Sequence, residues 1–403
     1  MNVSDYNKQF SEKINQLKKD GNYRYFLDVN KSAQHFPKFY FEDELGNKKM
    51  AVNWCSNDYL CMSLNEEVIS KLSFVAHKSG AGSSGTRNIS GTTIYHRELE
   101  TTLANLHKKE SALLFGGAYL ANLTALSTIG KILNKCVFIS DERNHASIIE
   151  GIRASGCERH VFRHNDLQHL EQTLQSLPQD VSKIVVFESV YSMSGTIAPV
   201  KEIIELAKKY NALTYIDEVH AVGLYGEDGA GISSALGVRE QIDIINGTLA
   251  KGFGVIGGYI AASKNIIDVV RSFGSGFIFT TSLPPSVCSA ANRSVQLVRD
   301  DVSIRGAYHS KVKLFRKILR GHGVDYLSNE SQITNLPIGD SMLCKQISDS
   351  LLHEHGIYIQ PINYPTVKRG EECFRITLSM RHSENDMIHL ARSLNEVLHA
   401  AAV

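Results

Sequence analysis

In two short stretches of the sequence, an apolar run is followed by side chains that can perform acid–base or covalent chemistry. The first, TYIDEVH, carries Asp217 and His220, and the second, NGTLAK, carries Thr248 and Lys251. Ligands of open α/β sheets bind at the carboxyl ends of the strands, so we expect both groups to face one cleft. A lysine amine close to a hydroxyl and opposite a buried carboxylate suits a cofactor that has an aldehyde, a phosphate and a protonated ring nitrogen.

Each of these residues also has a plainer interpretation. Lys251 could be a surface lysine, since lysine is seldom buried, and Asp217 could cap the helix that follows its strand. His220 could be a core histidine with its hydrogen bonds satisfied. The combination favours the cofactor site, because a carboxylate beside the ring nitrogen would keep that nitrogen protonated and able to withdraw electrons.

A glycine pattern at residues 252–257, GFGVIG, matches the GxGxxG fingerprint and would suggest a dinucleotide-binding oxidoreductase. Its context argues against this. The pattern precedes the strand-like run GGYIAAS, whereas the fingerprint follows a strand and opens a helix, and Phe277 stands where a ribose-binding acid is expected. We therefore attribute these glycines to tight packing beside Lys251.

Two further glycine-rich stretches could contact a ligand. The segment Gly80–His96 combines glycines with Thr86, Arg87 and Asn88, which can hydrogen-bond a carboxylate or phosphate, although a flexible linker has a similar composition. The segment FGGAYLAN at 115–122 follows an apolar run and could present a helix N-terminus to a phosphate. Its Tyr119 could instead belong to the core.

The order of apolar runs and helical patterns predicts the fold class. Strand-like runs at 112–115, 137–140, 183–188, 213–217, 242–248 and 257–262 alternate with helical patterns, and one strand–helix–strand unit is clear at 183–217. This predicts an α/β domain with a largely parallel sheet that is covered on both faces. A helical stretch after Pro284–Pro285 runs to about Gly321, and short strands (VDYL, TNLPIGD, IYIQPI, CFRITLS) with two helices then predict a smaller α+β domain. We place the N-terminal arm and part of the small domain at 1–60, the large domain at 61–300 and the C-terminal small domain at 301–403.

Composition narrows the class of partner. A net charge of +1, with 43 basic and 42 acidic residues spread along the chain, gives no reason to expect a nucleic acid or a membrane surface. The seven cysteines lack the spacing of a disulfide framework or a metal site, so we expect no metal. The N-terminal segment lacks the pattern of a signal or transit peptide, which predicts a cytoplasmic protein.

Taken together, the motifs resemble those of the α-oxoamine synthases, the fold-type I pyridoxal-phosphate (PLP) enzymes that condense an amino acid with an acyl-CoA. The resemblance spans residues 20–395 and rests on WCSNDYL, GAGSSGTRNISGTTIYHRELE, SDERNHASIIEGIR, FESVYSMSG, YIDEVHAVGLYG, NGTLAKGFGVIGGYIA, GFIFTTSLPP and QPINYPTVKRG. Within the family, GTRNISGT and QPINYPTV are similar to the branch that joins glycine to succinyl-CoA. That branch releases CoA and CO₂.

The resemblance implies a mostly parallel, seven-stranded sheet in the large domain, and it also implies a role for each site residue. Lys251 would hold PLP as a Schiff base and later act as the general base, with Asp217 at the ring nitrogen, His220 at the phenolic oxygen and His145 stacked on the ring. The residues that it assigns to the cofactor are Gly116, Gly117, Ala118, Tyr119, His145, Ser192, Asp217, His220, Thr248, Lys251, Thr280 and Thr281. Those that it assigns to the substrates are Arg24, Asn57, Thr86, Asn88, Ser140, Ser192, Thr366 and Arg375.

The resemblance also implies a homodimer, in which Thr280 or Thr281 reaches into the site of the second subunit. Asn57, Ser192 and Arg375 would hold the glycine carboxylate, while Arg24, Asn88 and Thr366 would receive the distal carboxylate of the succinyl group and Thr86 would limit acyl size. The segment 374–386 is more similar to the glycine C-acetyltransferase and 8-amino-7-oxononanoate synthase branches, so a different acyl-CoA is the alternative. A protein that keeps PLP without turnover is a further alternative, disfavoured because Lys251, Asp217, His145 and His220 are all present.

Overall fold

The computed structural model describes residues 3–43 and 45–401, which divide into two compact units. The large unit comprises Asn57–Ser192 and Thr196–Tyr308. The small unit comprises the described parts of Met1–Ser56 and His309–Val403, together with Met193–Gly195. No helix in the described part of the chain has the length and apolar character that a membrane span requires.

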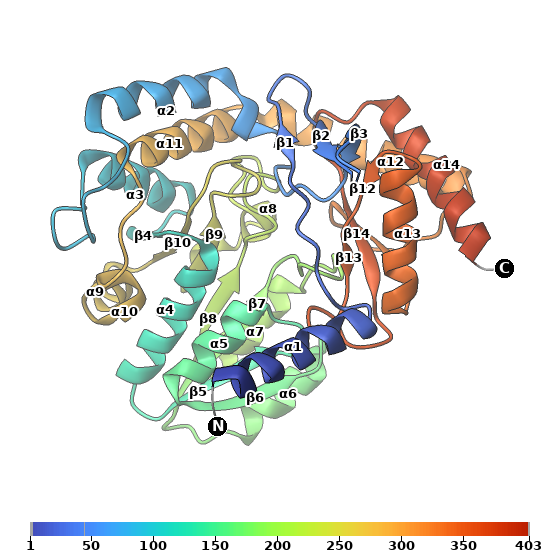
Figure 1. Ribbon diagram of the computed structural model, residues 1–403. Helices are drawn as coiled ribbons and strands as arrows, with labels where there is room; N and C mark the ends of the chain where they lie inside the picture. Colours follow the sequence, from blue (N-terminus) through green and yellow to red (C-terminus); the bar gives the residue numbers. More distant parts are fainter. Residues whose placement is uncertain (1–2, 44, 402–403) are drawn as a thin grey trace. The chain divides into compact units, whose positions relative to one another are not determined.

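A seven-stranded sheet forms the centre of the large unit (Figure 1). Its strand order is β4-β10-β9-β8-β7-β5-β6, and all pairs are parallel except the two made by β10. The strands are β4 (Ser111–Phe115), β5 (Cys136–Asp141), β6 (Glu158–Phe162), β7 (Ser182–Glu188), β8 (Ala212–Asp217), β9 (Ile244–Thr248) and β10 (Gly258–Ala262). This confirms the predicted fold class of a mostly parallel seven-stranded sheet.

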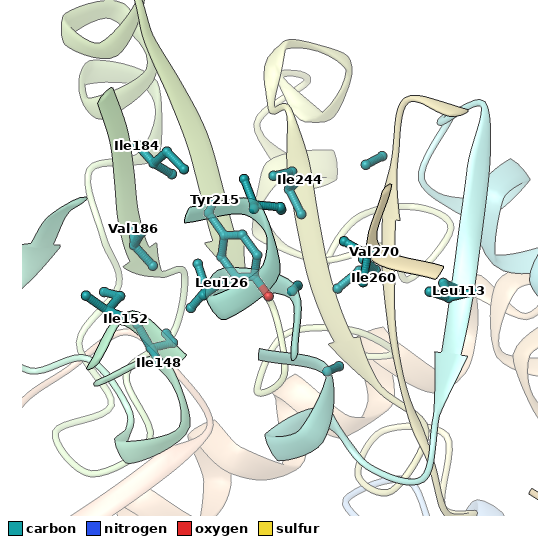
Figure 2. Close-up of a cluster of buried hydrophobic side chains, with 14 of the residues drawn as sticks. Leu113, Leu126, Ile148, Ile152, Ile184, Val186, Tyr215, Ile244, Ile260 and Val270 are labelled. Atoms are coloured by element: carbon teal, nitrogen blue, oxygen red, sulfur yellow. The ribbon is translucent and has the colours of Figure 1, made fainter. Parts of the chain in front are cut away.

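Helices cover this sheet because alternate strand residues bury apolar side chains against them. On one face, Ile184 and Val186 of β7 and Tyr215 of β8 pack with Leu126 and Ile148 of two covering helices (Figure 2). The intervening strand residues are also buried, so the strands read as continuous apolar runs, as expected of a parallel sheet covered on both faces. Because most of these strands are parallel, their carboxyl ends lie at the same edge of the sheet.

A helix follows each strand of the large unit from β4 to β8, and further helices precede β4 and follow β10. The helices of the large unit are α2 (Glu66–Ser79), α3 (Ile94–Leu106), α4 (Ala118–Ile132), α5 (Ala146–Ser155), α6 (Leu167–Ser176), α7 (Val200–Lys209), α8 (Ile232–Ala235), α9 (Lys264–Phe273), α10 (Ser275–Ile278) and α11 (Pro285–Asp300), with short 3₁₀ turns η1 (Met62–Leu64) and η2 (Arg239–Gln241). Local signals fix several starts. Asn65 accepts hydrogen bonds from two backbone N–H groups of α2, and Pro285 opens α11, where the missing N–H of proline has no helical partner to lose.

The small unit contains two further sheets. Their strands are β1 (Asn30–Lys31), β2 (Lys38–Glu42), β3 (Lys48–Asn53) and β12 (Ile357–Tyr358) in one, and β11 (Ile333–Pro337), β14 (Cys373–Thr377) and β13 (Pro361–Ile362) in the other. Its helices are α1 (Val3–Lys19), α13 (Ser341–His353) and α14 (Glu384–Ala401), and α12 (Val302–Gly321) continues into it from the large unit. Trp54 is fully buried there, stacked on His382 and Phe315.

Three sequence predictions of secondary structure were wrong in detail. The helical stretch after Pro284–Pro285 is two helices, because Asp301 is extended and its carboxylate accepts the Ser303 N–H at the start of α12. The run VDYL is not a strand and makes only an isolated bridge, between Leu327 and Asn335. The run at 357–362 is two short strands that belong to different sheets.

Candidate active site

Lys251 lies just beyond the end of β9 and makes a close contact with His220, which follows the neighbouring strand β8. The Lys251 Nζ is 2.6 Å from His220 Nε2, and the other ring nitrogen, Nδ1, is 2.9 Å from the Tyr59 hydroxyl. His220 and Tyr59 are both buried, so these contacts are shielded from water. The three side chains form a continuous polar chain that ends at the lysine amine.

The carboxylate of Asp217, at the end of β8, is held in one orientation. Its Oδ2 accepts a hydrogen bond of 2.7 Å from Asn122 Nδ2, and its Oδ1 accepts the Val219 N–H at 2.8 Å. The Asn122 amide is itself oriented by the Tyr215 hydroxyl, which donates to Asn122 Oδ1 at 2.8 Å. Asp217 is 4% exposed, so its carboxylate is buried in the unit in the orientation that these hydrogen bonds set.

His145 lies at the start of α5 and is tied to the same network. Its Nδ1 is 2.8 Å from the Ser147 hydroxyl, and Asn122 also donates to that hydroxyl, at 2.9 Å. Burial lowers the pKa of His145, the positive charge of Lys251 acts in the same direction, and the negative charge of Asp217 partly opposes them. The imidazole is therefore neutral near pH 7 and can lie flat against a cationic ring without charge repulsion.

The turn at Gly116 and Gly117 leads from β4 into α4 and has the features of a phosphate cradle. A Cβ atom added to either glycine would meet nothing within 4 Å, so open space lies in front of the backbone. Gly117 is the N-cap of α4 and gives it no side-chain cap, which leaves the first backbone N–H groups available to an anion. Ala118 and Tyr119 begin the helix, and the Tyr119 ring lies edge-on to His145 at 6.2 Å.

Thr248 is buried at the end of β9 and pairs with Gly258 of β10, the strand that lies between β9 and β4. Its hydroxyl donates to the Gly257 carbonyl at 3.1 Å and accepts the Ala250 N–H, also at 3.1 Å. Gly258 must be glycine, because a Cβ there would lie 2.1 Å from the Ala118 nitrogen. The GxGxxG stretch thus leads into β10 and not into a helix, which rules out a dinucleotide-binding turn here.

The comparisons with known proteins agree with this geometry. Residues 49–394 match the family described as aminotransferase class I and II. The chain is 46% identical over 391 residues to 5-aminolevulinate synthase 1 of Cereibacter sphaeroides, covering 97% of this chain and 96% of the relative. It is 47% identical over 393 residues to the 5-aminolevulinate synthase of Bradyrhizobium diazoefficiens, covering 98% and 96%.

The chain belongs to the 5-aminolevulinate synthases. This confirms the family that the motifs predicted, and it places the chain in the wider aminotransferase class I and II family. Among solved structures, the fold matches a high-resolution structure of SPT with PLP, with a TM-score of 0.90, 27% identity and full coverage of both chains. Sphingomonas wittichii serine palmitoyltransferase matches with a TM-score of 0.89 and 27% identity, covering 100% of this chain and 99% of that one.

In this member of the 5-aminolevulinate synthase family, several of the predicted substrate residues form hydrogen bonds within the large unit. The Asn57 side chain accepts a hydrogen bond from the Tyr59 hydroxyl at 3.4 Å, so Asn57 lies beside the polar chain that runs from Tyr59 through His220 to Lys251. The buried Ser192 donates its backbone N–H to Glu188 Oε2 at 3.2 Å. By contrast, Ser140 is buried at the end of β5, where its hydroxyl accepts from Asn144 and donates to a backbone carbonyl.

The glycine-rich segment that carries Thr86 and Asn88 is held in place by polar contacts. Thr86 donates to Asn88 Oδ1 at 2.6 Å, and Arg87 pairs with both carboxylate oxygens of Glu100 at 2.7 and 3.0 Å. Thr86 also forms an isolated bridge with Thr281. Thr280 and Thr281 line, together with Gly116, a narrow space of about 20 Å³ next to the phosphate cradle.

The remaining predicted substrate residues belong to the small unit. Arg24 donates to the Thr366 hydroxyl at 2.7 Å, although the two are 342 positions apart in the sequence. Arg375 is buried in β14 opposite Asn335. The structure therefore brings Arg24 together with Thr366, and Thr86 together with Asn88, as two separate pairs in different units.

Sequence reasoning missed four residues of the site: Tyr59, Asn122, Ser147 and Tyr215. Tyr59 lies in a motif that carried the resemblance and Asn122 lies in the glycine-rich stretch FGGAYLAN, but nothing in their spacing indicates their partners. Tyr215 stands two positions before Asp217 on one strand, so both side chains face the same side of the sheet. That alternation was the one signal that could have found Tyr215.

Proposed function

We propose that this chain is a PLP-dependent 5-aminolevulinate synthase, which condenses glycine with succinyl-CoA to give 5-aminolevulinate, CoA and CO₂. The observation that carries the proposal is the Lys251–His220 contact beside the fixed Asp217 carboxylate, in a chain 46% and 47% identical to curated 5-aminolevulinate synthases over nearly its whole length. PLP, when bound, supplies an electron sink that stabilises negative charge on the glycine Cα.

The residues present fit that cofactor. The open turn at Gly116 and Gly117 and the uncapped start of α4 suit its phosphate, with Thr248 beside them. Asp217 would hold the ring N–H, because its carboxylate is buried and its orientation is already set by Asn122. His145, neutral and adjacent to this network, would cover one face of the ring.

Lys251 has two tasks in this proposal. Its amine would carry the cofactor aldehyde, and after glycine has replaced it, the same amine would remove a proton from the glycine Cα. The base must be neutral at that point and close to the reacting carbon. His220, at 2.6 Å from Nζ, positions the amine and can share its proton, and Tyr59 fixes the imidazole from the other side.

The two substrates each bring a carboxylate that needs a cationic anchor. We assign the glycine carboxylate to Arg375 with Asn57 and Ser192, and the distal succinyl carboxylate to Arg24 with Asn88 and Thr366. Thr86 would limit the size of the acyl group. Arginine suits both tasks, because its planar guanidinium binds a carboxylate through two parallel hydrogen bonds. The Arg24–Thr366 hydrogen bond supports the second assignment, since it already orients the guanidinium.

We further propose that the active enzyme is a homodimer, with Thr280 or Thr281 contributed to the site of the partner copy. This assignment rests on the resemblance of the segment around these threonines to the family. The cytoplasmic location drawn from the N-terminal segment stays a prediction.

A panel assay tests the proposed function. The purified protein, loaded with PLP, is given glycine and one of succinyl-, acetyl-, propionyl- or pimeloyl-CoA, while thiol release is followed and products are identified by mass. We expect a strong preference for succinyl-CoA and 5-aminolevulinate as the product. Preference for another acyl-CoA would overturn the substrate assignment in favour of a related acyltransferase, and the absence of turnover with all four would overturn the enzymatic proposal.

A further inference from the structure

Helix α12 carries an unusual concentration of positive charge for a chain whose net charge is +1. Its sequence, VSIRGAYHSKVKLFRKILRG, contains six lysines and arginines and no acidic residue. Four of the six, Lys313, Arg316, Lys317 and Arg320, recur at the spacing of one helix face. Like charges three and four positions apart repel, so this arrangement costs the isolated helix stability.

The opposite side of the same helix fixes its orientation. Val312, Phe315 and Leu319 are buried in the small unit, which leaves Lys313, Lys317 and Arg320 exposed. The basic face is therefore a consequence of how the helix packs, and the charges are held on a rigid element.

The basic face forms one wall of a hollow within the small unit, which we call the α12 groove. It encloses about 380 Å³ and is lined by Lys313, Arg316, Lys317, Arg320, Tyr326, Ser328 and Asn329. Asp325 and Glu330 belong to the same loop, but neither lines the groove. In the described part of the chain, no ion pair joins them or any other carboxylate to Lys313, Lys317 or Arg320.

Arg316 gives the groove its shape. Its guanidinium donates to the Asn329 carbonyl at 2.8 Å, to Asn329 Oδ1 at 2.9 Å and to the Ile333 carbonyl at 2.8 Å. These bonds tie the loop to the helix. Arg320 rests over the Tyr326 ring, with its Cζ 5.0 Å from the ring centroid. Its charged group is thus placed on an aromatic support at the groove, where cation–π contact limits its motion.

We propose that the α12 groove binds a small molecule with two or more phosphate groups, either free or as part of a nucleotide. Lys313, Lys317 and Arg320, which form no ion pair in the described part of the chain, focus a positive potential in a concave surface, and a polyphosphate would relieve their mutual repulsion. Lysine and arginine are the residues that bind phosphate oxygens, and Ser328 and Asn329 add neutral donors. The volume lies within the range of about 300–1,000 Å³ typical of small-molecule sites.

Calorimetric titration of the full-length PLP-loaded protein with inorganic triphosphate tests this, with sulfate titrated in parallel to measure non-specific binding. The test variant is the double substitution Lys313→Gln/Lys317→Gln. The matched control, Lys131→Gln/Lys201→Gln, removes two exposed lysines that lie on α4 and α7. We expect triphosphate affinity to fall by about tenfold or more in the test variant and to stay within about twofold in the control, because two charge-assisted contacts are lost only in the first.

The two sources of phosphate are then separated with ATP. Tighter binding of ATP than of triphosphate would show that the groove also contacts the nucleoside, and equal affinities would show that it contacts the phosphates alone. Equal losses in the test and control variants, or triphosphate binding no tighter than sulfate, would overturn the proposal. Both double variants replace exposed lysines, so thermal unfolding of each should match the unsubstituted protein and exclude misfolding as the cause.

Discussion

Asp217 and Glu188 are register partners at the ends of adjacent parallel strands, so two buried carboxyl groups lie side by side at the edge of the sheet that carries Lys251. Burial, and next the negative charge of Asp217, hold the pKa of Glu188 well above its usual range. Two adjacent carboxylates in a buried site cannot both ionise without a large penalty. We infer that Asp217 carries the charge and Glu188 keeps its proton.

This assignment predicts a pH effect that the substitution Glu188→Gln removes. The folded-state pKa of Glu188 is raised, so its contribution to stability is fully present below the unfolded pKa of about 4.5 and is lost as the pH rises toward the folded value. In this window the unsubstituted apo protein should lose about 1.4 kcal/mol of stability per pH unit relative to Glu188→Gln. Urea unfolding of both proteins at pH 6, 7 and 8 measures the difference. A constant difference across these values would show that Glu188 is ionised when folded.

The Asn122 amide should matter to activity chiefly through Asp217, which accepts the shorter of its two side-chain hydrogen bonds, the other going to the Ser147 hydroxyl. Asn122→Ala removes the 2.7 Å hydrogen bond to the carboxylate, and we expect kcat to fall by about tenfold, the equivalent of one charge-assisted hydrogen bond. Tyr215→Phe leaves that bond intact and removes only the 2.8 Å contact that orients Asn122, so its effect should be smaller. Steady-state kinetics, together with the affinity of each apo protein for PLP, give the ranking. Equal activity in both variants and the unsubstituted chain would mean that the network is structural.

Lys251→Ala should abolish condensation altogether. Both the amine that carries the cofactor and the base that removes the Cα proton disappear, whereas the phosphate cradle and Asp217 remain, so PLP should still bind weakly. Dialysis against PLP and an assay for multiple turnovers measure the two properties. Lys264→Ala, at an exposed lysine, is the control and should keep full activity. Multiple turnovers by Lys251→Ala would contradict the assignment of this residue.

Arg24 is expected to distinguish among acyl groups. Arg24→Leu removes the proposed anchor of the distal carboxylate, so kcat/KM for succinyl-CoA should fall by about tenfold or more, with little change for acetyl-CoA, which has no such carboxylate. Thr366→Val keeps the guanidinium and removes only its 2.7 Å partner, so it should have an intermediate effect. Equal losses with both acyl-CoA substrates would show that Arg24 has no part in selecting the acyl group.

Strand ends were predictable from the sequence and side-chain networks were not. Asp217 and Lys251 each follow an apolar run. Because neighbouring parallel strands end at the same edge of a sheet, the residues that follow these two runs lie close together. The edge strand β6 escaped detection, because Glu158 and Val161 on it are exposed and no apolar run marks it. Asn122 was missed for a different reason: its partners Tyr215 and Asp217 lie 93 and 95 positions away, and only the tertiary packing of α4 joins them.

The stability of the small unit should depend on pH through His382. This ring is stacked on Trp54 at 3.9 Å, its Nδ1 accepts the Ser379 N–H at 2.9 Å, and its Nε2 lies 3.0 Å from the Asn53 carbonyl. Burial lowers the pKa of His382 to about 4, and the backbone hydrogen bonds with Asn53 and Ser379 oppose this shift only in part.

The sign of the effect follows from that shift. The folded-state pKa lies below the ordinary value of about 6.5, so the stability that His382 contributes is present above pH 6.5 and is lost as the pH falls toward 4, by about 1.4 kcal/mol per pH unit. His382→Gln should be less stable at pH 7, because it loses the stacking and both hydrogen bonds, yet its stability should fall less steeply on acidification. Urea unfolding at pH 7, 6 and 5 compares the slopes, with the exposed His77→Gln as the control that keeps the original slope. An unchanged slope in His382→Gln would assign the acid sensitivity to other buried histidines, of which His107, with its pKa lowered by burial to about 3, is the first to replace.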